Sequence, residues 1–574
     1  MEYKNENRIC QNCKKDFTIE PEDFNFYEKI KVPPPTFCPE CRMIRRMIWR
    51  NIRSLYHREC GLCKKSIISM YADDGVPVYC RDCWYGDNWD PFSYGKEYDF
   101  SKPFFIQLKQ LSNTVPRFFS YKFGNLINSE FTNYTVDNKN TYLSYSVVGC
   151  EDVSYSENID YSKNCLDCFG AMKLDNCYYN IDCKSNYNTY YAIKSQDCID
   201  SCFIYDCINC QNCCLSYNLR NQQYFFKNKK LSKEEYKKAI QELHLEKYSG
   251  FENTKKELNN LIRDKALHKY AFIYMSKNTT GDYIHNAKNT KQCFDAYDTE
   301  DTAYCVRSFT TKSNYDTQGS SIGSELIYES NAASKNTYKD FFCYITIEGC
   351  RECQYSLLLK NCSNCFGCIG LNKAQFCIFN KQYSEKEYFE MVEKIKKHMM
   401  EMPYIDKKGI VYKYGEFFPH DMSPYGYNET SANDYFPITK EEALQKGYPW
   451  KEREERNYKI TKRSEELPDN ILDVEKDILN EIIACPNKGE QLYQCTTAFK
   501  IMPDELQFYK QKNLPLPRYC PNCRHYQRLK YRNPMRLYER KCMKKGCNNI
   551  FKTTYTPDQP EIVYCERCYN QEVY

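Results

Sequence analysis

Long hydrophobic runs are absent from this sequence of 574 residues, and so is a recognisable secretion signal. No apolar stretch approaches the roughly 18 residues that a membrane-spanning helix needs. The first residues also lack the charged and apolar regions of a signal peptide. We therefore expect a cytoplasmic protein without membrane contact, whose thiols are kept reduced.

Histidine and the common catalytic motifs are scarce as well. The chain has only seven histidines, and none stands in a nucleophile or metal-catalysis motif. It contains no P-loop, GxGxxG or GxSxG sequence. The net charge of +5 excludes a polycation, so any nucleic-acid surface must be local. These absences favour a protein that is not an enzyme.

Tyrosine and cysteine are abundant instead, with 54 and 36 residues. One cysteine-containing stretch occurs twice, at residues 38–60 and again at 520–542. A shift of 482 residues superimposes the two copies, including Cys-Pro-x-Cys-Arg at the start of each. The protein therefore begins and ends with the same module.

Each module carries eight cysteines in the spacing of zinc knuckles. A tight turn at each C-x2-C pair can direct two thiolates at one ion, and two such turns form a tetrahedral site. We expect about four zinc ions, with each pair joined to the next along the chain, although buried or unpaired thiols are the alternative. In the second module two knuckles are wider than C-x2-C, which leaves the third site the least secure. The expected ligands are Cys10, Cys13, Cys38, Cys41, Cys60, Cys63, Cys80, Cys83, Cys485, Cys495, Cys520, Cys523, Cys542, Cys547, Cys565 and Cys568.

The stretch between the zinc sites is basic in both modules. Residues 42–58 are predicted to be helical, with four arginines on one face. The second copy has Pro534 where the first has Ile52, which predicts a shorter or kinked helix. An arginine stripe beside zinc knuckles suggests RNA or DNA binding, and the alternative is a solvated face or arginines that hold the modules in place. The residues expected to contact nucleic acid are Arg42, Arg46, Arg50, Arg53, Trp49, Arg524, Arg528, Arg532 and Tyr531.

These motifs resemble a known family. Cys10-x2-Cys13, Phe26-Tyr27 and Cys38-Pro-Glu-Cys-Arg42 are similar to the bacterial "probable zinc-ribbon" family, and the second module repeats the pattern. The whole chain resembles zinc-ribbon proteins of candidate phyla radiation bacteria, including a segment like that at residues 417–430. The resemblance implies zinc binding and implies no activity.

The middle of the chain repeats at a short interval. Asn or Asp followed by Cys or Tyr recurs from Asn164 to Asn209 at intervals of ten to twelve positions. Such a period is too short for helical repeats and indicates stacked strands and turns. We predict a mainly β fold with a central parallel β-solenoid and about two of these units per coil. The Asn and Asp residues are expected in left-handed or turn positions, and the cysteines in a buried core.

The solenoid is expected in two related halves, each closed by a helix. Ser232 with Glu235 and Ser384 with Glu387 form capping boxes at the starts of helices expected near 232–265 and 384–400. The predicted parts are a paired zinc-ribbon module (1–90), a connector (91–125), solenoid half 1 (126–230), a helical insertion (231–278), solenoid half 2 (279–383), a capping helix (384–402), a wrapping segment with a charged linker (403–470) and a second paired module (471–574).

Three functions are consistent with this organisation. The leading one is a non-enzymatic structural-zinc protein that binds nucleic acid or a ribonucleoprotein at both ends. The second is a protein–protein scaffold with purely structural zinc, and a weaker third is a carbohydrate-binding or carbohydrate-active solenoid. The runs Cys207-x2-Cys210-x2-Cys213 and Cys362-x2-Cys365-x2-Cys368 have iron–sulfur spacing. We expect core thiols there and no cluster, because three-residue spacing also follows from solenoid geometry.

Overall fold

The computed structural model describes residues 3–452 and 457–574; part of the predicted charged linker therefore lies outside the described residues. The chain is strand-rich with mostly parallel sheets, which confirms the prediction of a mainly β protein. It divides into two compact units that each join distant parts of the sequence. Unit 1 comprises Met1–Ser120, Ala271–Lys451 and Met535–Leu537, and unit 2 comprises Tyr121–Tyr270, Glu452–Pro534 and Tyr538–Tyr574.

Unit 2 contains a parallel stack of strands over residues 121–230, which we call the first coil stack. From Leu126 onward, paired residues lie twelve positions apart, as in Val153↔Cys165 and Tyr190↔Cys202, whereas Lys122 at the start of the stack pairs with Thr135, thirteen positions later. The chain therefore completes one coil in each such step, and successive coils lie one strand spacing apart, about 4.8 Å. The predicted period was close, but two units per coil was wrong, because a single unit completes the coil. The strands are β7 (Lys122–Ile127), β8 (Thr132–Asn133), β9 (Thr135–Tyr142), β10 (Ser144–Tyr145), β11 (Glu151–Ser154), β12 (Glu157–Asp160), β13 (Lys163–Leu166), β14 (Phe169–Met172), β15 (Tyr190–Ile193), β16 (Cys202–Tyr205), β17 (Gln211–Tyr217) and β18 (Gln223–Phe226).

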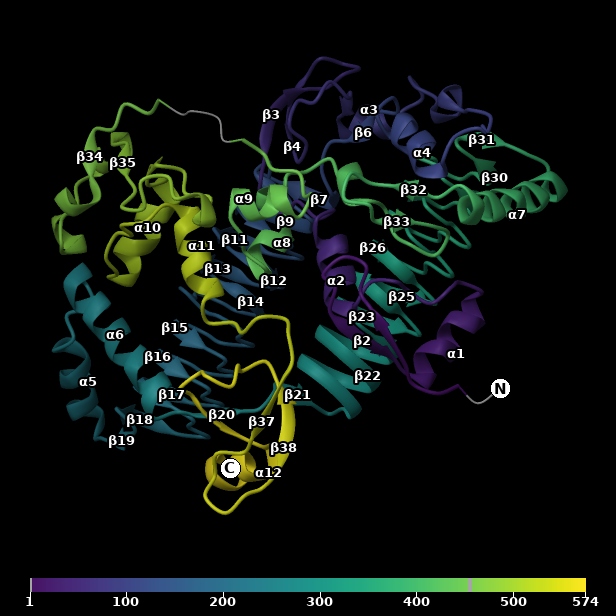
Figure 1. Ribbon diagram of the computed structural model, residues 1–574. Helices are drawn as coiled ribbons and strands as arrows, with labels where there is room; N and C mark the ends of the chain where they lie inside the picture. Colours follow the sequence, from purple (N-terminus) through teal and green to yellow (C-terminus); the bar gives the residue numbers. More distant parts are fainter. Residues whose placement is uncertain (1–2, 453–456) are drawn as a thin grey trace. The chain divides into compact units, whose positions relative to one another are not determined.

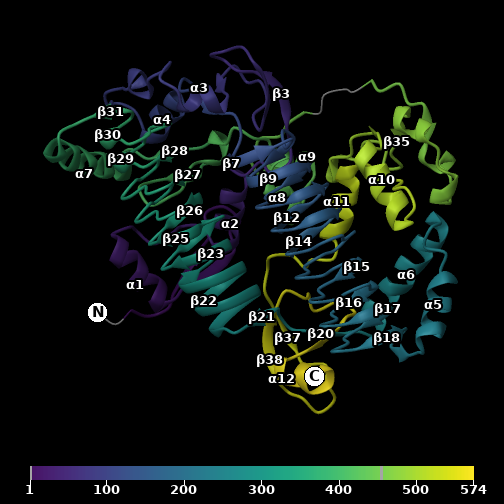
Figure 2. The ribbon, with the colours of Figure 1, turned by 180° about the vertical axis from the view of Figure 1, so that it is seen from behind.

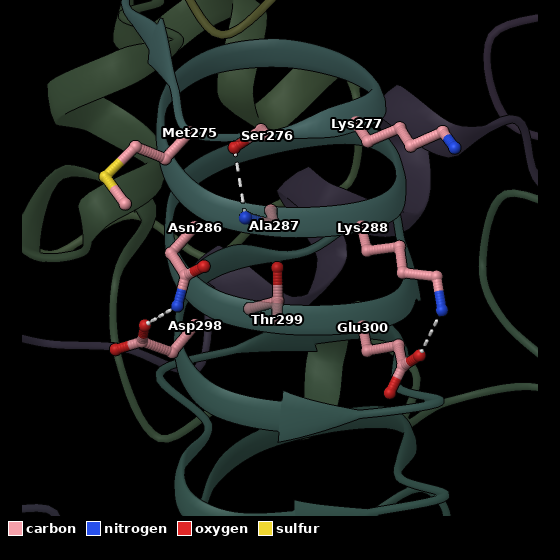
Figure 3. Close-up of a pocket in the computed structure, with 9 residues that line it drawn as sticks. All are labelled: Met275, Ser276, Lys277, Asn286, Ala287, Lys288, Asp298, Thr299 and Glu300. Atoms are coloured by element: carbon pink, nitrogen blue, oxygen red, sulfur yellow. Dashed lines mark hydrogen bonds and ion pairs between the residues drawn. The ribbon is translucent and has the colours of Figure 1, made fainter.

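Unit 1 contains a matching second coil stack over residues 271–383. Figure 3 shows its first turns lying one above another. Phe294 pairs with Val306, twelve positions later, whereas Asn331 pairs with Tyr344, thirteen positions later. Single residues are therefore inserted into some coils. The strands are β21 (Ile273–Tyr274), β22 (Lys277–Ala303), β23 (Val306–Lys312), β24 (Tyr315–Gln318), β25 (Ser321–Glu325), β26 (Tyr328–Ser334), β27 (Tyr344–Ile347), β28 (Leu357–Lys360), β29 (Ser363–Phe366) and β30 (Gln375–Ile378).

The corners of the coils are residues in the left-handed backbone conformation, and they recur at every third position. In the first stack they run without interruption from Tyr134 to Lys227. The predicted left-handed role is confirmed for Asn164, Asn176 and Asp197, whereas Asn186 points inward and is buried. This conformation is unfavourable for residues with a side chain. Ladder hydrogen bonds between successive coils offset the strain at each corner.

The residue after each corner points into the stack. Because corners recur at every third position of the twelve-position coil, each coil has four inward positions, and the core accepts mainly small side chains. The first stack is filled by Cys, Val, Ala, Ile and Leu side chains, with Cys207, Cys210 and Cys213 at most 1% exposed. The second stack has a core of the same kind around Cys365 and Cys377. The three-residue cysteine spacing therefore follows from the coil, as expected.

Helices close one end of each stack. In unit 2 this is α5 (Lys233–Gln241), beside β18, whereas α6 (Tyr248–Asp264) lies along the side of the stack, where Phe251 contacts Tyr178, Tyr191 and Phe203 of successive coils (Figures 1 and 2). In unit 1 it is α7 (Glu385–Glu401), beside β30. Both predicted capping boxes form, at Ser232 and at Ser384. Among the described residues, no helix is long and apolar enough to cross a membrane.

The two terminal modules have matching elements. The first has hairpins β1 (Glu6–Ile9)/β2 (Asp16–Ile19) and β3 (Tyr56–Glu59)/β4 (Ser66–Ser69), strand β5 (Val78–Tyr79), and helices α1 (Pro21–Ile30), α2 (Pro39–Met47) and α3 (Arg81–Tyr85). The second has the pair β35 (Ile483–Ala484)/β36 (Ala498–Phe499), the hairpin β37 (Tyr538–Lys541)/β38 (Ile550–Thr553), strand β39 (Ile562–Tyr564), and helices α10 (Pro503–Lys512), α11 (Pro521–Leu529) and α12 (Glu566–Val573).

The basic helices are shorter than predicted. Helix α2 ends at Met47, so Arg50 and Arg53 lie beyond it, and the expected helix over 42–58 is wrong. Helix α11 has the same length as α2. Pro534 therefore does not shorten the second copy, because both helices end well before that position.

Neither module belongs to the same unit as the coil stack that is nearest to it in sequence. The N-terminal module (residues 1–90) belongs to unit 1, together with the second coil stack. Most of the C-terminal module (residues 471–574) belongs to unit 2, together with the first coil stack. Each unit thus pairs one module with the stack that is farther from it in sequence.

Candidate metal centres and the buried arginines beside them

Four groups of four cysteines converge within the described residues. In each group the four sulfur atoms all lie within 4.8 Å of one another, a separation at which they could hold one metal ion. The predicted pairing of neighbouring knuckles is confirmed, and Cys485 and Cys495 do complete the third group. The groups are Cys10/Cys13/Cys38/Cys41, Cys60/Cys63/Cys80/Cys83, Cys485/Cys495/Cys520/Cys523 and Cys542/Cys547/Cys565/Cys568.

Each group has a cysteine at the start of a helix. Cys38, Cys80, Cys520 and Cys565 occupy the N-cap positions of α2, α3, α11 and α12. The positive end of a helix dipole stabilises nearby negative charge. Four thiolates around a divalent ion carry a net charge of −2, so this placement fits a metal–thiolate centre.

Backbone and amide groups also donate hydrogen bonds to the sulfur atoms. The Cys38 amide donates to the Cys10 sulfur at 3.3 Å, and the Asn12 side chain donates to the Cys41 sulfur at 3.3 Å. The third group repeats this, because Asn487 donates to the Cys523 sulfur at 3.1 Å. Such donors orient ligands and favour the ionised form. Hydrogen bonding with Cys485 lowers the pKa of the Cys495 thiol to about 7.

The four groups differ in their access to solvent. Cys13 and Cys63 are exposed, whereas all eight cysteines of the C-terminal module are buried. A chelator reaches an exposed ligand without local unfolding, so the two N-terminal sites are open to direct attack.

We therefore expect metal release to a chelator to be biphasic. About two of roughly four ions should leave quickly from the N-terminal module, and the others should leave slowly because their release requires opening of the C-terminal module. A colorimetric zinc-release assay with excess chelator measures both phases, and release after denaturation gives the total. Release in a single phase would contradict this reading of the exposed ligands.

The arginines of α2 are buried among carboxylates of unit 1. Arg45 binds Glu329 at 2.8 Å and Glu416 at 2.7 Å. Arg46 binds Asp316 at 3.1 Å and Glu329 at 3.2 Å. Burial favours the neutral form of a guanidinium, but Glu329 and Glu416 outweigh this and raise the pKa of Arg45. The cluster is an ion-pair network closed from water.

The adjacent N-terminal residues are enclosed as well. Arg42 binds Asp316 at 2.9 Å and is 2% exposed. Arg50 is 5% exposed and passes over Gly319, where an added Cβ would lie 2.8 Å from its guanidinium. Arg53 is half-buried. Glycine is required at position 319 for two reasons. A larger side chain would collide with Arg50, and the backbone φ of +71° lies in the left-handed region that favours glycine.

The C-terminal module repeats the arrangement in unit 2. Arg524 binds Asp167 at 3.3 Å and Glu505 at 3.0 Å, and Arg528 also binds Asp167. Arg532 binds Asp182 at 2.8 Å. Because Arg524 and Arg528 are at most 4% exposed, both are removed from solvent.

The two aromatic residues expected to stack on bases pack inside the protein. Trp49 is 1% exposed and its ring centroid lies 4.8 Å from that of Phe418. The hydroxyl of Tyr531 contacts that of Tyr191 and donates to Asn259 at 2.8 Å. Most of the residues expected to contact nucleic acid therefore lie in the faces by which the modules dock, with Arg53 only half-buried, and nucleic-acid binding through them stays a prediction. The full expected set is Arg42, Arg46, Arg50, Arg53, Trp49, Arg524, Arg528, Arg532 and Tyr531.

The acidic partners of these arginines were not predicted. Asp167 and Asp182 were expected to be turn residues, and both do stand at left-handed corners of the first stack. Asp316 and Glu329 occupy corners of the second stack. Each corner side chain points outward, so an acid at a corner is placed to meet a docking module. Asp167 and Asp316 occupy matching positions in the two stacks only when the single-residue insertions of the second stack are counted, so the sequence alone carried little signal for them.

One hollow on the second stack is open to solvent. It has a volume of about 740 Å³ and lies at the start of the stack (Figure 3). Lys288 pairs with Glu300 at 2.9 Å, and Asn286 donates to Asp298 at 2.6 Å, each along the stack. The polar side chains thus form rungs between successive coils.

Comparison of the chain with protein-family models finds no match, and comparison with curated proteins finds none either.

Proposed function

We propose that this protein is a non-enzymatic scaffold in which two β-solenoids each carry a paired zinc-ribbon module. The observation that supports this most directly is the burial of Arg45 and Arg46, which are 0% exposed and bind carboxylates of the solenoid. Arginines placed in this way act as docking groups. The surfaces left for protein partners are the solvent-facing sides of the coils, such as the one in Figure 3.

The metal we propose is zinc, at about four ions per chain. Four cysteine ligands in a closed set are typical of structural zinc sites, whereas catalytic sites keep one position for water or substrate. The amide donors to the Cys10 and Cys523 sulfurs support bound thiolates. We also propose that the chain works in the cytoplasm, where reducing conditions keep its cysteines as thiols. The resemblance to the "probable zinc-ribbon" family agrees with this assignment.

Binding of RNA or DNA through the zinc-ribbon arginines is the alternative. It would require the modules to leave the solenoids, because Arg46 and Arg528 are fully enclosed. Leaving would also expose apolar side chains to water, such as Leu506 and Tyr509, which share a core cluster with Phe169 of the first stack, and this exposure is unfavourable. Carbohydrate binding along the tyrosine-rich surface remains the weaker third proposal.

A salt titration distinguishes the scaffold from the nucleic-acid reading. Labelled RNA and duplex DNA are titrated against the reduced, zinc-loaded chain at several salt concentrations. Phosphate binding would show an affinity that falls steeply as salt rises, with a slope that decreases by about one unit for each contact removed. We expect no such dependence from the arginine clusters.

Two variants make the titration specific. We expect the double variant Arg42→Ala with Arg46→Ala to lose stability and to show no change in nucleic-acid affinity. Lys335→Ala with Lys339→Ala removes two exposed lysines of the same unit and serves as the matched control. Salt-steep binding that disappears in the arginine variant while that variant stays folded would reject the scaffold reading.

A further inference from the structure

The two units use equivalent residues to hold their modules. The shift of 482 residues places Arg42 on Arg524 and Arg46 on Arg528. Both arginines of each pair bind one corner carboxylate, which is Asp316 in unit 1 and Asp167 in unit 2. The aromatic contacts match too. The ring centroids of Phe26 and Tyr328 lie 5.8 Å apart, and those of the counterpart Phe508 and Tyr178 lie 6.2 Å apart. These shared features do not tell one module from the other.

One position breaks the equivalence. One coil beyond the shared aspartate, the same corner holds Glu329 in the second stack and Tyr179 in the first. The module residue facing this corner is Arg45 in unit 1, and the shift of 482 residues gives Gln527 as its counterpart. Arg45 binds Glu329 at 2.8 Å, whereas Gln527 and Tyr179 line a small cavity of about 40 Å³. Unit 1 thus has a charged pair at the position where unit 2 has two uncharged residues.

We propose that Arg45 and Glu329 determine which stack each module binds. An N-terminal module on the first stack would bury Arg45 against Tyr179, with no carboxylate in place of Glu329. A C-terminal module on the second stack would leave Glu329 without the cation that Arg45 supplies. The first wrong pairing buries a guanidinium without a carboxylate. The second leaves Glu329 with one close cation fewer, because of its close cations only the counterpart of Arg46, which binds Glu329 at 3.2 Å, would remain near it. Such mismatches of buried charge are a usual basis of discrimination between similar interfaces.

The order of the chain makes such a determinant necessary. The N-terminal module (1–90) is followed, after a connector, by the first stack, yet it belongs to the unit of the second stack. Proximity in sequence favours the wrong partner, so the interface itself must select the right one. Glu416 strengthens the selection, since this third carboxylate binds Arg45 at 2.7 Å and belongs to unit 1. The inference rests on the docking in the proposed function and on no particular partner.

Photo-crosslinking in the full chain tests the assignment. Phe26 is replaced by p-benzoylphenylalanine, because its ring lies 3.9 Å from Tyr315 in the correct pairing. In the wrong pairing this position would take the place of Phe508, beside Tyr178. Mass spectrometry of the digested product counts crosslinks to each stack, and mixing isotopically labelled with unlabelled chains separates exchange between copies from pairing within one chain.

The key variant, Arg45→Gln with Glu329→Tyr, replaces the charged pair of unit 1 with the two uncharged residue types that unit 2 has at this position. We expect crosslinks to the first stack to rise from under about a tenth of the total to about a third or more. The matched control, Lys288→Gln with Glu300→Tyr, makes the same changes in an exposed pair of the same stack and should leave the ratio unchanged.

A second variant protects the test against misfolding. Gln527→Arg with Tyr179→Glu places the charged pair in unit 2 as well and leaves unit 1 intact. Because both interfaces then carry the same pair, the same rise in wrong pairing is expected. Crosslinking that stays confined to the second stack in either folded variant would overturn the proposal, as would loss of folding in both. Zinc content and the salt titration of the same samples report separately on the proposed function.

Discussion

Asp167→Asn is expected to destabilise unit 2 by about 3–5 kcal/mol, because it leaves a buried guanidinium without its carboxylate. Asp167 is fully buried and binds both Arg524 and Arg528. Arg524 keeps Glu505 at 3.0 Å, so the loss falls mainly on Arg528. Asparagine tolerates the left-handed conformation at this corner, so the substitution changes the charge and preserves the backbone.

Chemical denaturation followed by hydrogen exchange of the two units measures the effect. The matched control is Glu151→Gln, a carboxylate of the same stack that binds Lys139 and Lys163 but is 32% exposed. Exposed pairs contribute about 0–1 kcal/mol, so this variant should remain close to the wild type. Equal effects of the two substitutions would show that the buried cluster does not hold the module in place.

Cys523→Ser is expected to remove about one of roughly four metal ions and to unfold the C-terminal module, because metal affinity is folding free energy in small zinc domains. If the predicted parts of the chain folded separately, the first stack would stay folded in this variant. The structure changes this expectation, since Cys523 and Leu506 share one core cluster with Phe169 and Tyr178 of the first stack. The outer face of that stack should lose protection along with the module.

Hydrogen exchange with mass spectrometry locates the loss, and metal analysis counts the ions. Unit 1 should keep its protection, because its own module and stack are unaltered. Cys213→Ser is the control, a buried inward cysteine outside the four metal groups of the described chain. Serine occupies similar inward positions, such as Ser195, so this control should keep all its metal and stability within about 1 kcal/mol. Loss of protection in unit 1 after Cys523→Ser would contradict the division into two units.

The cysteine groups could be predicted largely from the sequence, because their geometry is local. Two cysteines in one tight turn converge on one point whatever surrounds them. The wide knuckle of Cys485 and Cys495, which the sequence left least secure, also completes a group, since the module around it repeats the first one. The capping boxes at Ser232 and Ser384 were predictable for the same reason.

The coil could be predicted only in part. The anchors such as Asn164 and Asn176 showed the length of the repeat but not how many repeats close one turn. The register Val153↔Cys165 resolves this, because the chain returns to the same side after one repeat. The spacing of Cys207, Cys210 and Cys213 already indicated the length of one coil. Inward residues recur every three positions, and four of them make up the twelve positions of one coil.

The role of the arginines depended on tertiary structure. Helical spacing showed that Arg42 and Arg46 share one side, but spacing does not say whether that side meets water or protein. The carboxylates that bind Arg46, Asp316 and Glu329, lie 270 and 283 residues away from it in sequence. The sequence by itself thus determined the ligand groups, the small-residue core and the helix starts, which arise from neighbouring residues. Only the tertiary structure decided which module meets which stack, because that choice depends on burying each charge with a partner from a distant segment.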